Sequence, residues 1–223
     1  MPPKAEGPAK AGSRAMYLTR TPELLKPFYR ELLWSVDTAA KEIYLTFDDG
    51  PDPNVTPWVL DTLAHFDAKA TFFCLGAQIA RHPGLFHRTR AEGHGIGNHT
   101  WDHRNGWRTP TFTYLRNVLL CQLQTGTPLF RPPYGRISRE QINALKGRFR
   151  IVMWDVLTGD FDTNITGEHC LANAVDHARP GSIVVFHDTA KAAMRMKHAL
   201  PHALEHWRKE GYRFGVLAGG TTG

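Results

Sequence analysis

The stretch EIYLTFDDGPDP, residues 42–53, ends an apolar run in two adjacent carboxylates, Asp48 and Asp49, and then turns at Gly50-Pro51. Short apolar and β-branched runs bounded by Gly and Pro are typical of buried strands. Two neighbouring negative charges repel each other, and a core strand gains no stability from either. A turn in which Asp bonds its own backbone would be the simpler structural explanation. We interpret the pair as a strand end that carries chemistry.

Short apolar runs and stretches of helical spacing alternate along the rest of the chain. The predicted strands are 42–47, 70–76, 95–100, 129–134, 150–156, 182–188 and 212–218. The predicted helices are 55–66, 82–93, 114–124, 139–149, 168–178 and 194–211. Such alternation implies a parallel sheet, either a closed barrel or a doubly wound sheet. Reactive residues near the ends of several strands favour the barrel, whose active site is built at that end.

The length and composition are those of one globular domain: the chain has 223 residues, of which 42% are hydrophobic and 22% charged. No run of about 18 apolar residues occurs, so we expect no membrane span. The net charge of +6 is scattered without a dense basic run, so we expect no nucleic-acid partner. Cys74, Cys121 and Cys170 are expected to be reduced and buried, because they lack the spacing of a disulfide or metal framework.

The segment HTWDH places His99 and His103 four residues apart. At this spacing two rings share one face of a helix or converge in a curled loop, where they can bind a metal. The chain has twelve histidines, so such a pair also arises by chance. An HExxH metalloprotease site needs Glu directly after the first histidine, and Thr100 stands there. A general base must therefore come from another part of the chain.

The aspartate pair can supply both a third metal ligand and a base. Two histidines and one carboxylate leave open positions for water and substrate, as a catalytic zinc site requires. Successive side chains of an extended chain point in opposite directions, so Asp48 and Asp49 can take different roles. A calcium loop is excluded, because the D-x-D-x-D-G register and the distal Glu are missing. Non-haem iron oxygenases use the same ligand set but need no added base and acid.

Two further strand ends carry candidate residues. FRPPYGR, residues 130–136, combines a stiff Pro-Pro backbone with Arg131, which could pair with a carboxylate in the site or form a surface salt bridge. VVFHD, residues 184–188, ends an apolar strand with His187. A lone histidine there is often a core residue, but its place at the same end of the sheet favours a general acid. Asp160 is the carboxylate best placed to keep this histidine protonated.

Together these segments resemble one family. TFDDGP, NHTWDH, RPPYG, WDVLTGDF and VVFHD stand in the order of the five motifs of the NodB-homology polysaccharide deacetylases, a class of carbohydrate esterases. The resemblance implies a distorted (β/α)7 barrel, in agreement with the seven strands predicted above. We accordingly divide the chain into a flexible tail over residues 1–15, a helical or irregular segment over 16–40 and a catalytic domain over 41–219.

The resemblance also implies roles for the site residues. Asp48 would be the catalytic base, oriented by Arg131, and His187 would be the acid, tuned by Asp160. The backbone N–H of Tyr134 would help to hold the oxyanion. A divalent metal, zinc or a similar ion such as cobalt, would be bound by Asp49, His99 and His103.

Substrate contacts are expected from Trp101, Pro132, Phe161 and Val185. Phe161 and Val185 replace the family's usual tryptophan and leucine around the acetyl methyl group, and Leu157 replaces an aspartate of the common pattern. These departures bear on substrate fit more than on the chemistry. Trp101 and Trp107 bracket the second motif, so both are candidate platforms for stacking a sugar ring.

The expected activity is metal-dependent hydrolysis of N-acetyl groups on an N-acetylglucosamine polymer, chitin-like or peptidoglycan-like. Hydrolysis of O-acetyl groups on a xylan-type polymer, or of a small-molecule amide, would use the same machinery and stays open. An inactive carbohydrate-binding protein would lack a ligand, the base or the acid, and all are present. We expect a monomer. The first fifteen residues show no secretory signal, as in a cytoplasmic protein, but the family generally acts on wall or extracellular material, so the compartment stays open.

Overall fold

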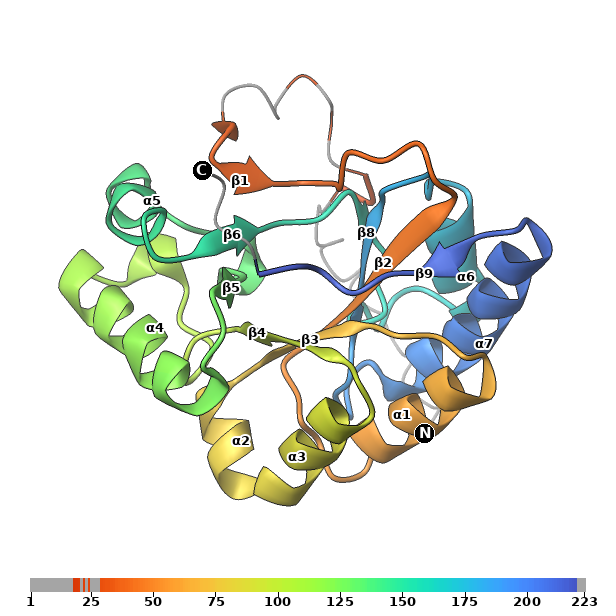
Figure 1. The fold of residues 1–223 in the computed structure, drawn as a ribbon, viewed down its shortest axis with the longest axis horizontal. Helices are drawn as coiled ribbons and strands as arrows, with labels where there is room; N and C mark the ends of the chain where they lie inside the picture. Colours follow the sequence, from red (N-terminus) through yellow and green to blue (C-terminus); the bar gives the residue numbers. More distant parts are fainter. Residues whose placement is uncertain (1–17, 21, 23, 25–28, 220–223) are drawn as a thin grey trace, which may run out of the picture.

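The computed structural model describes residues 18–20, 22, 24 and 29–219, so the predicted tail over residues 1–15 lies outside the described part. Its centre is a curled parallel sheet, and the helices surround the outer face (Figure 1). The described strands are β1 (Leu32–Leu33), β2 (Glu42–Asp48), β3 (Thr71–Cys74), β4 (Gly95–Asn98), β5 (Leu129–Phe130), β6 (Arg150–Val152), β7 (Val156–Leu157), β8 (Ile183–His187) and β9 (Arg213–Phe214). The described helices are α1 (Thr56–His65), α2 (Gly76–Arg81), α3 (Pro83–Ala91), α4 (Thr111–Thr125), α5 (Arg139–Leu145), α6 (Gly167–Val175) and α7 (Ala193–Lys209).

The strands follow the order β1-β6-β5-β4-β3-β2-β8-β7, and β9 pairs with the first residues of β2. Each pair in this order is parallel, as strands joined by helical crossovers require. All carboxyl ends of the strands therefore lie at one end of the barrel. The predicted barrel-like α/β architecture is confirmed.

The number of strands differs from the seven predicted, because the run at residues 150–156 is not one strand. It contains β6 and the start of β7, which lie at different places in the sheet. Between β6 and β7, the N–H of Met153 donates to the carbonyl oxygen of Leu33, in the edge strand β1, at 2.7 Å. Two residues later, Asp155 N donates to Ile183 O of β8 at 3.1 Å. This short segment therefore crosses from one side of the open barrel to the other.

The segment that precedes the predicted catalytic domain contains one short strand among its described residues. The segment over residues 16–40 is expected to be helical or irregular, but Leu32–Leu33 form β1 and pair with β6. A strand of two residues is too short to show the alternation by which strands are recognised. Helix α2 was not predicted either, because six residues give less than two full turns of periodicity.

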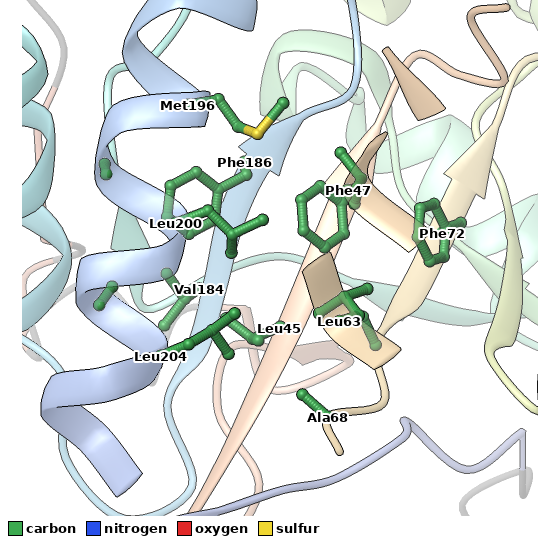
Figure 2. Close-up of a cluster of buried hydrophobic side chains, with 14 of the residues drawn as sticks. Leu45, Phe47, Leu63, Ala68, Phe72, Val184, Phe186, Met196, Leu200 and Leu204 are labelled. Carbon is green, nitrogen blue, oxygen red and sulfur yellow. The ribbon is translucent and has the colours of Figure 1, made fainter. Parts of the chain in front are cut away.

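Alternation along β2 decides which residues face the helices and which face the barrel interior. The outward-facing residues, which join a hydrophobic cluster under α1 and α7, are Ile43, Leu45 and Phe47. The inward-facing residues are Tyr44, Thr46 and Asp48. Figure 2 shows the Phe47 ring between Phe186 and Phe72, and the ring centroids lie 6.0 and 5.0 Å away. The alternation that packs Phe47 between the sheet and the helices therefore places the next side chain, Asp48, in the barrel interior.

Candidate active site

Asp48 and His187 stand directly opposite each other at the carboxyl ends of β2 and β8, since they are partners in the parallel register. On β8, Val184 and Phe186 join the outer cluster, so His187 belongs to the opposite, inward-facing set. The next residue of β2, Asp49, leaves the strand with a left-handed backbone, at a φ of 79°. Two strand ends therefore present three candidate side chains at the rim where β/α barrels build active sites.

The three predicted metal ligands converge at this rim. Asp49 Oδ1 lies 3.1 Å from His103 Nε2 and 3.4 Å from His99 Nε2. Among the described residues, these three form the one group of His, Cys, Asp or Glu side chains close enough to share a metal ion. The histidines lie in a curled loop after β4 rather than on a helical turn. Thr100 and His103 both take left-handed backbones, at φ of 69° and 64°, which lets the two rings meet.

Polar side chains hold this loop in its curled form. Asn98 Oδ1, at the end of β4, accepts the Thr100 N–H at 2.9 Å. The Thr100 hydroxyl then accepts the His103 N–H at 3.0 Å. From α4, Asn117 Oδ1 accepts the Trp101 N–H at 2.9 Å. The backbone N–H groups of this loop have no strand to pair with, and these side chains accept their hydrogen bonds instead. The bonds thereby fix the loop and the directions of the two histidine rings.

Each histidine is oriented by its other ring nitrogen. His99 Nδ1 lies 2.9 Å from the carbonyl oxygen of Arg131, and His103 Nδ1 lies 3.1 Å from the hydroxyl of Tyr134. This leaves Nε2 of both rings directed at Asp49, the arrangement that metal-binding histidines take. Asp49 Oδ1 is buried and has no hydrogen-bond partner among the described residues. A buried carboxylate oxygen between two ring nitrogens, without a donor of its own, fits a divalent cation.

The charge state of Asp49 also fits a ligand. Burial alone would raise the pKa of this carboxyl group, because it disfavours the charged form. The contacts with His103 and His99 and the charge of His187 outweigh burial and hold the pKa well below its usual range. Asp49 is therefore an ionised carboxylate at neutral pH, which is the form that binds metals.

Asp48 is held by Arg131, whose side chain is fully buried, so the arginine makes no surface salt bridge. Its Nη1 donates to Asp48 Oδ1 and to Thr46 Oγ1, each at 2.7 Å. Its Nη2 donates to the carbonyl oxygen of Met153 at 2.9 Å. The second carboxylate oxygen, Asp48 Oδ2, lies 4.0 Å from His99 Nε2. One oxygen of Asp48 is thus anchored, and the other faces the metal ligands.

His187 is paired with Asp160, which is buried. The carboxylate accepts the His187 backbone N–H at 2.7 Å and lies 2.8 Å from its Nδ1. Arg195 Nε fixes the same aspartate by donating to its carbonyl oxygen at 2.7 Å. Burial would lower the pKa of His187, but the charge and hydrogen bond of Asp160, with smaller effects from Asp49 and Asp48, raise it to about 9. The imidazole is therefore protonated at neutral pH, as a general acid must be.

Tyr134 lies in a tight turn, Pro133–Gly135, that begins at the second of the two prolines. The N–H groups that close the turn are those of Gly135 and Arg136, which donate to Pro132 O and Pro133 O. The Tyr134 N–H precedes them, and the first donors of a helical turn have no partner within it. Tyr134 itself has a left-handed backbone at φ 60°. Its N–H therefore has no partner within the turn.

These groups open into a cavity of about 780 Å³. Its apolar lining includes Trp34, Trp107, Trp154, Leu157, Phe161 and Val185. An apolar wall with a few polar groups is typical of a site for a small acyl group and a sugar face. Trp101 and Pro132, two of the four predicted substrate contacts, do not line this cavity. Trp101 instead packs over Gly76, where a Cβ atom would come within 2.5 Å of the indole.

Asp188 is a site residue that the sequence reasoning missed. It is buried behind the aspartate pair, where Oδ1 accepts the Gly50 N–H at 3.1 Å and Oδ2 accepts the Thr56 hydroxyl at 2.5 Å. A Cβ atom on Gly50 would come within 2.0 Å of Asp188 Oδ2, so only glycine fits there. Burial raises the pKa of Asp188 to about 8. The hydrogen bond from Thr56 opposes this rise, and the negative charge of Asp49 adds to it. Asp188 directly follows His187, a position that could have drawn attention to it.

The family model described as polysaccharide deacetylase matches residues 35–147. The chain is also 35% identical over 188 residues to a peptidoglycan-N-acetylglucosamine deacetylase of Bacillus cereus, covering 81% of this chain and 88% of that protein. This chain therefore belongs to the polysaccharide deacetylase family, a family of hydrolases. The peptidoglycan-N-acetylglucosamine deacetylase PgdA of Listeria monocytogenes is 37% identical over 183 residues, which is 78% of this chain. The chain spans only 37% of the length of that relative.

Solved structures show the same fold. The Bc1960 peptidoglycan N-acetylglucosamine deacetylase superposes with a TM-score of 0.78 and 31% identity, covering 88% of this chain and 95% of that one. Peptidoglycan deacetylase PdaC of Bacillus subtilis gives a TM-score of 0.72 and 28% identity, covering 82% and 90% of the two chains. No helix within the described residues is both long and apolar enough to cross a membrane.

Proposed function

We propose that this chain hydrolyses the N-acetyl group of N-acetylglucosamine units in a polysaccharide, releasing acetate and a free amine. The observation that supports this most strongly is that Asp48 and His187, which are register partners on adjacent strands, line one cavity together with three residues that could share a metal ion. Amide hydrolysis needs a base for the attacking water and an acid for the leaving amine. The names of the Bacillus and Listeria relatives point to the same substrate class.

The attack on the carbonyl would rely on Asp48 and Tyr134. When bound, a divalent ion would polarise the acetyl carbonyl and lower the pKa of a water molecule from about 16 towards 7. Asp48 would accept the proton of the attacking water through Oδ2, because Arg131 occupies Oδ1. The Tyr134 N–H would donate to the oxygen that gains negative charge, an interaction commonly worth about 3–4 kcal/mol of barrier.

The departure of the amine would rely on His187. An amide nitrogen leaves readily only when it is protonated, and the raised pKa of His187 keeps a proton available at neutral pH. Asp160 holds Nδ1, so the proton would be given from Nε2. Phe161 and Val185 line the cavity beside this histidine and would enclose the acetyl methyl group.

The ion that fits the ligand set best is zinc, since two imidazoles and one carboxylate with open positions are typical of catalytic zinc. We also expect the chain to act as a monomer. Metal analysis of the purified protein and light scattering after size exclusion test these two points. A stoichiometric metal other than zinc, or a stable dimer, would correct them.

The decisive experiment is acetate release from a panel of acetylated glycans, with and without a chelator. The panel holds N-acetylglucosamine oligomers, peptidoglycan glycan strands, O-acetylated xylan and a small acetanilide. We expect chelator-sensitive release from the first two. Release from xylan or acetanilide alone would replace the proposed substrate class while keeping the chemistry, and release that survives complete metal removal would overturn the mechanism.

A further inference from the structure

A second cavity adjoins the candidate active site. It has a volume of about 490 Å³ and shares His103, Tyr134 and Arg136 with the lining of the first cavity. Its other charged lining residues are Asp102, Arg104 and Arg108. A ligand whose acetyl group lies at the metal ligands would therefore reach this second cavity by extending across Tyr134.

The second cavity carries an excess of positive charge. Three arginines face one carboxylate, and that carboxylate is already used, because Arg104 binds Asp102 through Nε and Nη2 at 2.9 Å each. Arg108 and Arg136 remain, and neither has a carboxylate within ion-pair distance among the described residues. Exposed cations of this kind are usually only solvated, but these two share a cavity that opens into the candidate active site.

The side chain of Arg136 is positioned by a contact with an aromatic ring. Its guanidinium carbon lies 5.3 Å from the centre of the Trp107 ring. Trp107 is held in turn, since its indole N–H donates to Ile137 O at 3.1 Å and its backbone N–H to Asn105 Oδ1 at 3.0 Å. The indole is nevertheless 66% exposed and lines the first cavity. The guanidinium thus lies over an exposed aromatic ring, and the two side chains together offer an aromatic surface and a positioned cation.

An aromatic face and a cation together match a sugar that carries an anionic substituent. The aromatic ring packs against the apolar face of a sugar, and a guanidinium binds a carboxylate through two parallel hydrogen bonds. We propose that Arg136 and Arg108 form a subsite for a carboxylate on the sugar next to the one that is deacetylated. This inference rests on the proposed function, and it assigns the enzyme to a carboxylate-bearing glycan rather than to a neutral chitin-like chain.

The test compares one glycan in two charge states. Peptide-free peptidoglycan tetrasaccharides, in which every second sugar bears a lactyl carboxylate, are used as the free acid and as the methyl ester. The ester carries no charge and is larger than the carboxylate by one methyl group. Steady-state kcat/KM for acetate release is measured for the wild type, for R108Q, R136Q and the double variant, and for R213Q. Arg213 is an exposed arginine on β9, beside the amino end of β2 and thus at the opposite end of the barrel.

We expect the wild type to favour the free acid by about tenfold, the usual scale for a charge-assisted hydrogen bond. In the double variant this ratio should fall to about two or less, and R213Q should keep the wild-type ratio. The preference should also weaken as salt is raised, because exposed charges are screened. Equal rates on acid and ester in the wild type, or an unchanged ratio in the double variant, would overturn the subsite. Failure to release acetate from any glycan would instead overturn the proposed function.

Discussion

Arg131 and Asp48 form an ion pair beneath the cavity in which the guanidinium is completely screened from solvent, at an Nη1–Oδ1 distance of 2.7 Å. The arginine follows β5 and the aspartate ends β2, so the pair joins strands that are separated by β4 and β3 in the sheet. One carboxylate oxygen is held from across the barrel, and the other is directed at the metal ligands. The position of Asp48, the proposed base, therefore depends on how the sheet curls between β2 and β5.

The substitution Asp48→Asn keeps the shape of the side chain and removes its ability to accept a proton. We expect kcat to fall by about 10²–10⁴-fold, the usual contribution of a general base. Metal content should be unchanged, because Asp49, His99 and His103 are intact. Acetate release and metal analysis of the same preparation measure both quantities. Full turnover would show that another group is the base, and loss of the metal would show that Asp48 is a ligand.

Replacing Arg131 by Met leaves the Asp48 carboxylate buried without its partner. Breaking a buried pair on one side commonly costs about 3–5 kcal/mol, and we expect a loss of that order in the free energy of unfolding in urea. R131K should be milder, because it keeps a charge but not the planar fork that reaches Thr46, Asp48 and Met153. K209Q, which removes an exposed pair with Glu205, is the control and should leave stability unchanged. An R131M protein as stable as the wild type would refute this prediction.

The pH profile should depend on Asp160. The folded-state pKa of His187 is about 9, above its ordinary value of 6.5, so this proposed general acid loses its proton only as the pH rises through about 9. D160N removes the largest factor that raises this pKa, and the alkaline limb of kcat should move to lower pH. The raised pKa stabilises the fold fully below about 6.5 and no longer above about 9. D160N should therefore cost more stability at pH 6 than at pH 10, and an unmoved alkaline limb would exclude His187 as the acid.

Metal removal should weaken the fold as well as stop turnover. The three proposed ligands come from the residue that follows β2 and from the loop after β4, so a bound ion would link two separate segments. A ligand at a hundredfold excess over its Kd stabilises the folded state by about 2.7 kcal/mol, and a chelator should lower Tm accordingly. H103A should lose this metal-dependent rise in Tm. H87A, which changes an exposed histidine on α3, should keep it.

Gly50 should tolerate no side chain. In G50A the added methyl group would collide with the Asp188 carboxylate, displacing either this buried group or the Asp48-Asp49 segment. We expect a marked loss of kcat and of stability, whereas an ordinary Gly-to-Ala change within a helix stabilises by roughly 0.5–1 kcal/mol. The control is G84A, because nothing lies within 4 Å of a Cβ atom at Gly84. Equal behaviour of the two variants would mean that Asp188 does not constrain the aspartate pair.

Most of the regular fold could be predicted from the sequence, because the elements show strong apolar periodicity and the strands end at the candidate site residues. The apolar run before Asp48 and the run before His187 are both buried strands, and their ends meet in register. Helices with a clear apolar face, such as α7, lie within a few residues of their predicted bounds. The convergence of Asp49, His99 and His103 was implied by the family resemblance rather than by spacing alone.

The rest depends on contacts that leave little trace in sequence. The apolar run at residues 150–156 hides a crossing between two edges of the barrel, because both halves are equally hydrophobic. Trp101 lies within the second motif but is turned towards α2 by the curled loop, whereas Trp107 faces the cavity. The anchoring of His103 by the Tyr134 hydroxyl joins loops about thirty residues apart, and only the folded chain brings them together.

The left-handed backbones at the rim have a consequence for laboratory evolution. Five non-glycine residues of the described chain take this conformation, and four of them, Asp49, Thr100, His103 and Tyr134, surround the reacting groups. Each costs on the order of 1 kcal/mol or more, which glycine would relieve. Selection for heat resistance would thus favour glycine at positions whose side chains form or support the proposed active site. Libraries of this protein should be screened for acetate release from the first round, since survival of heating alone will enrich inactive sequences.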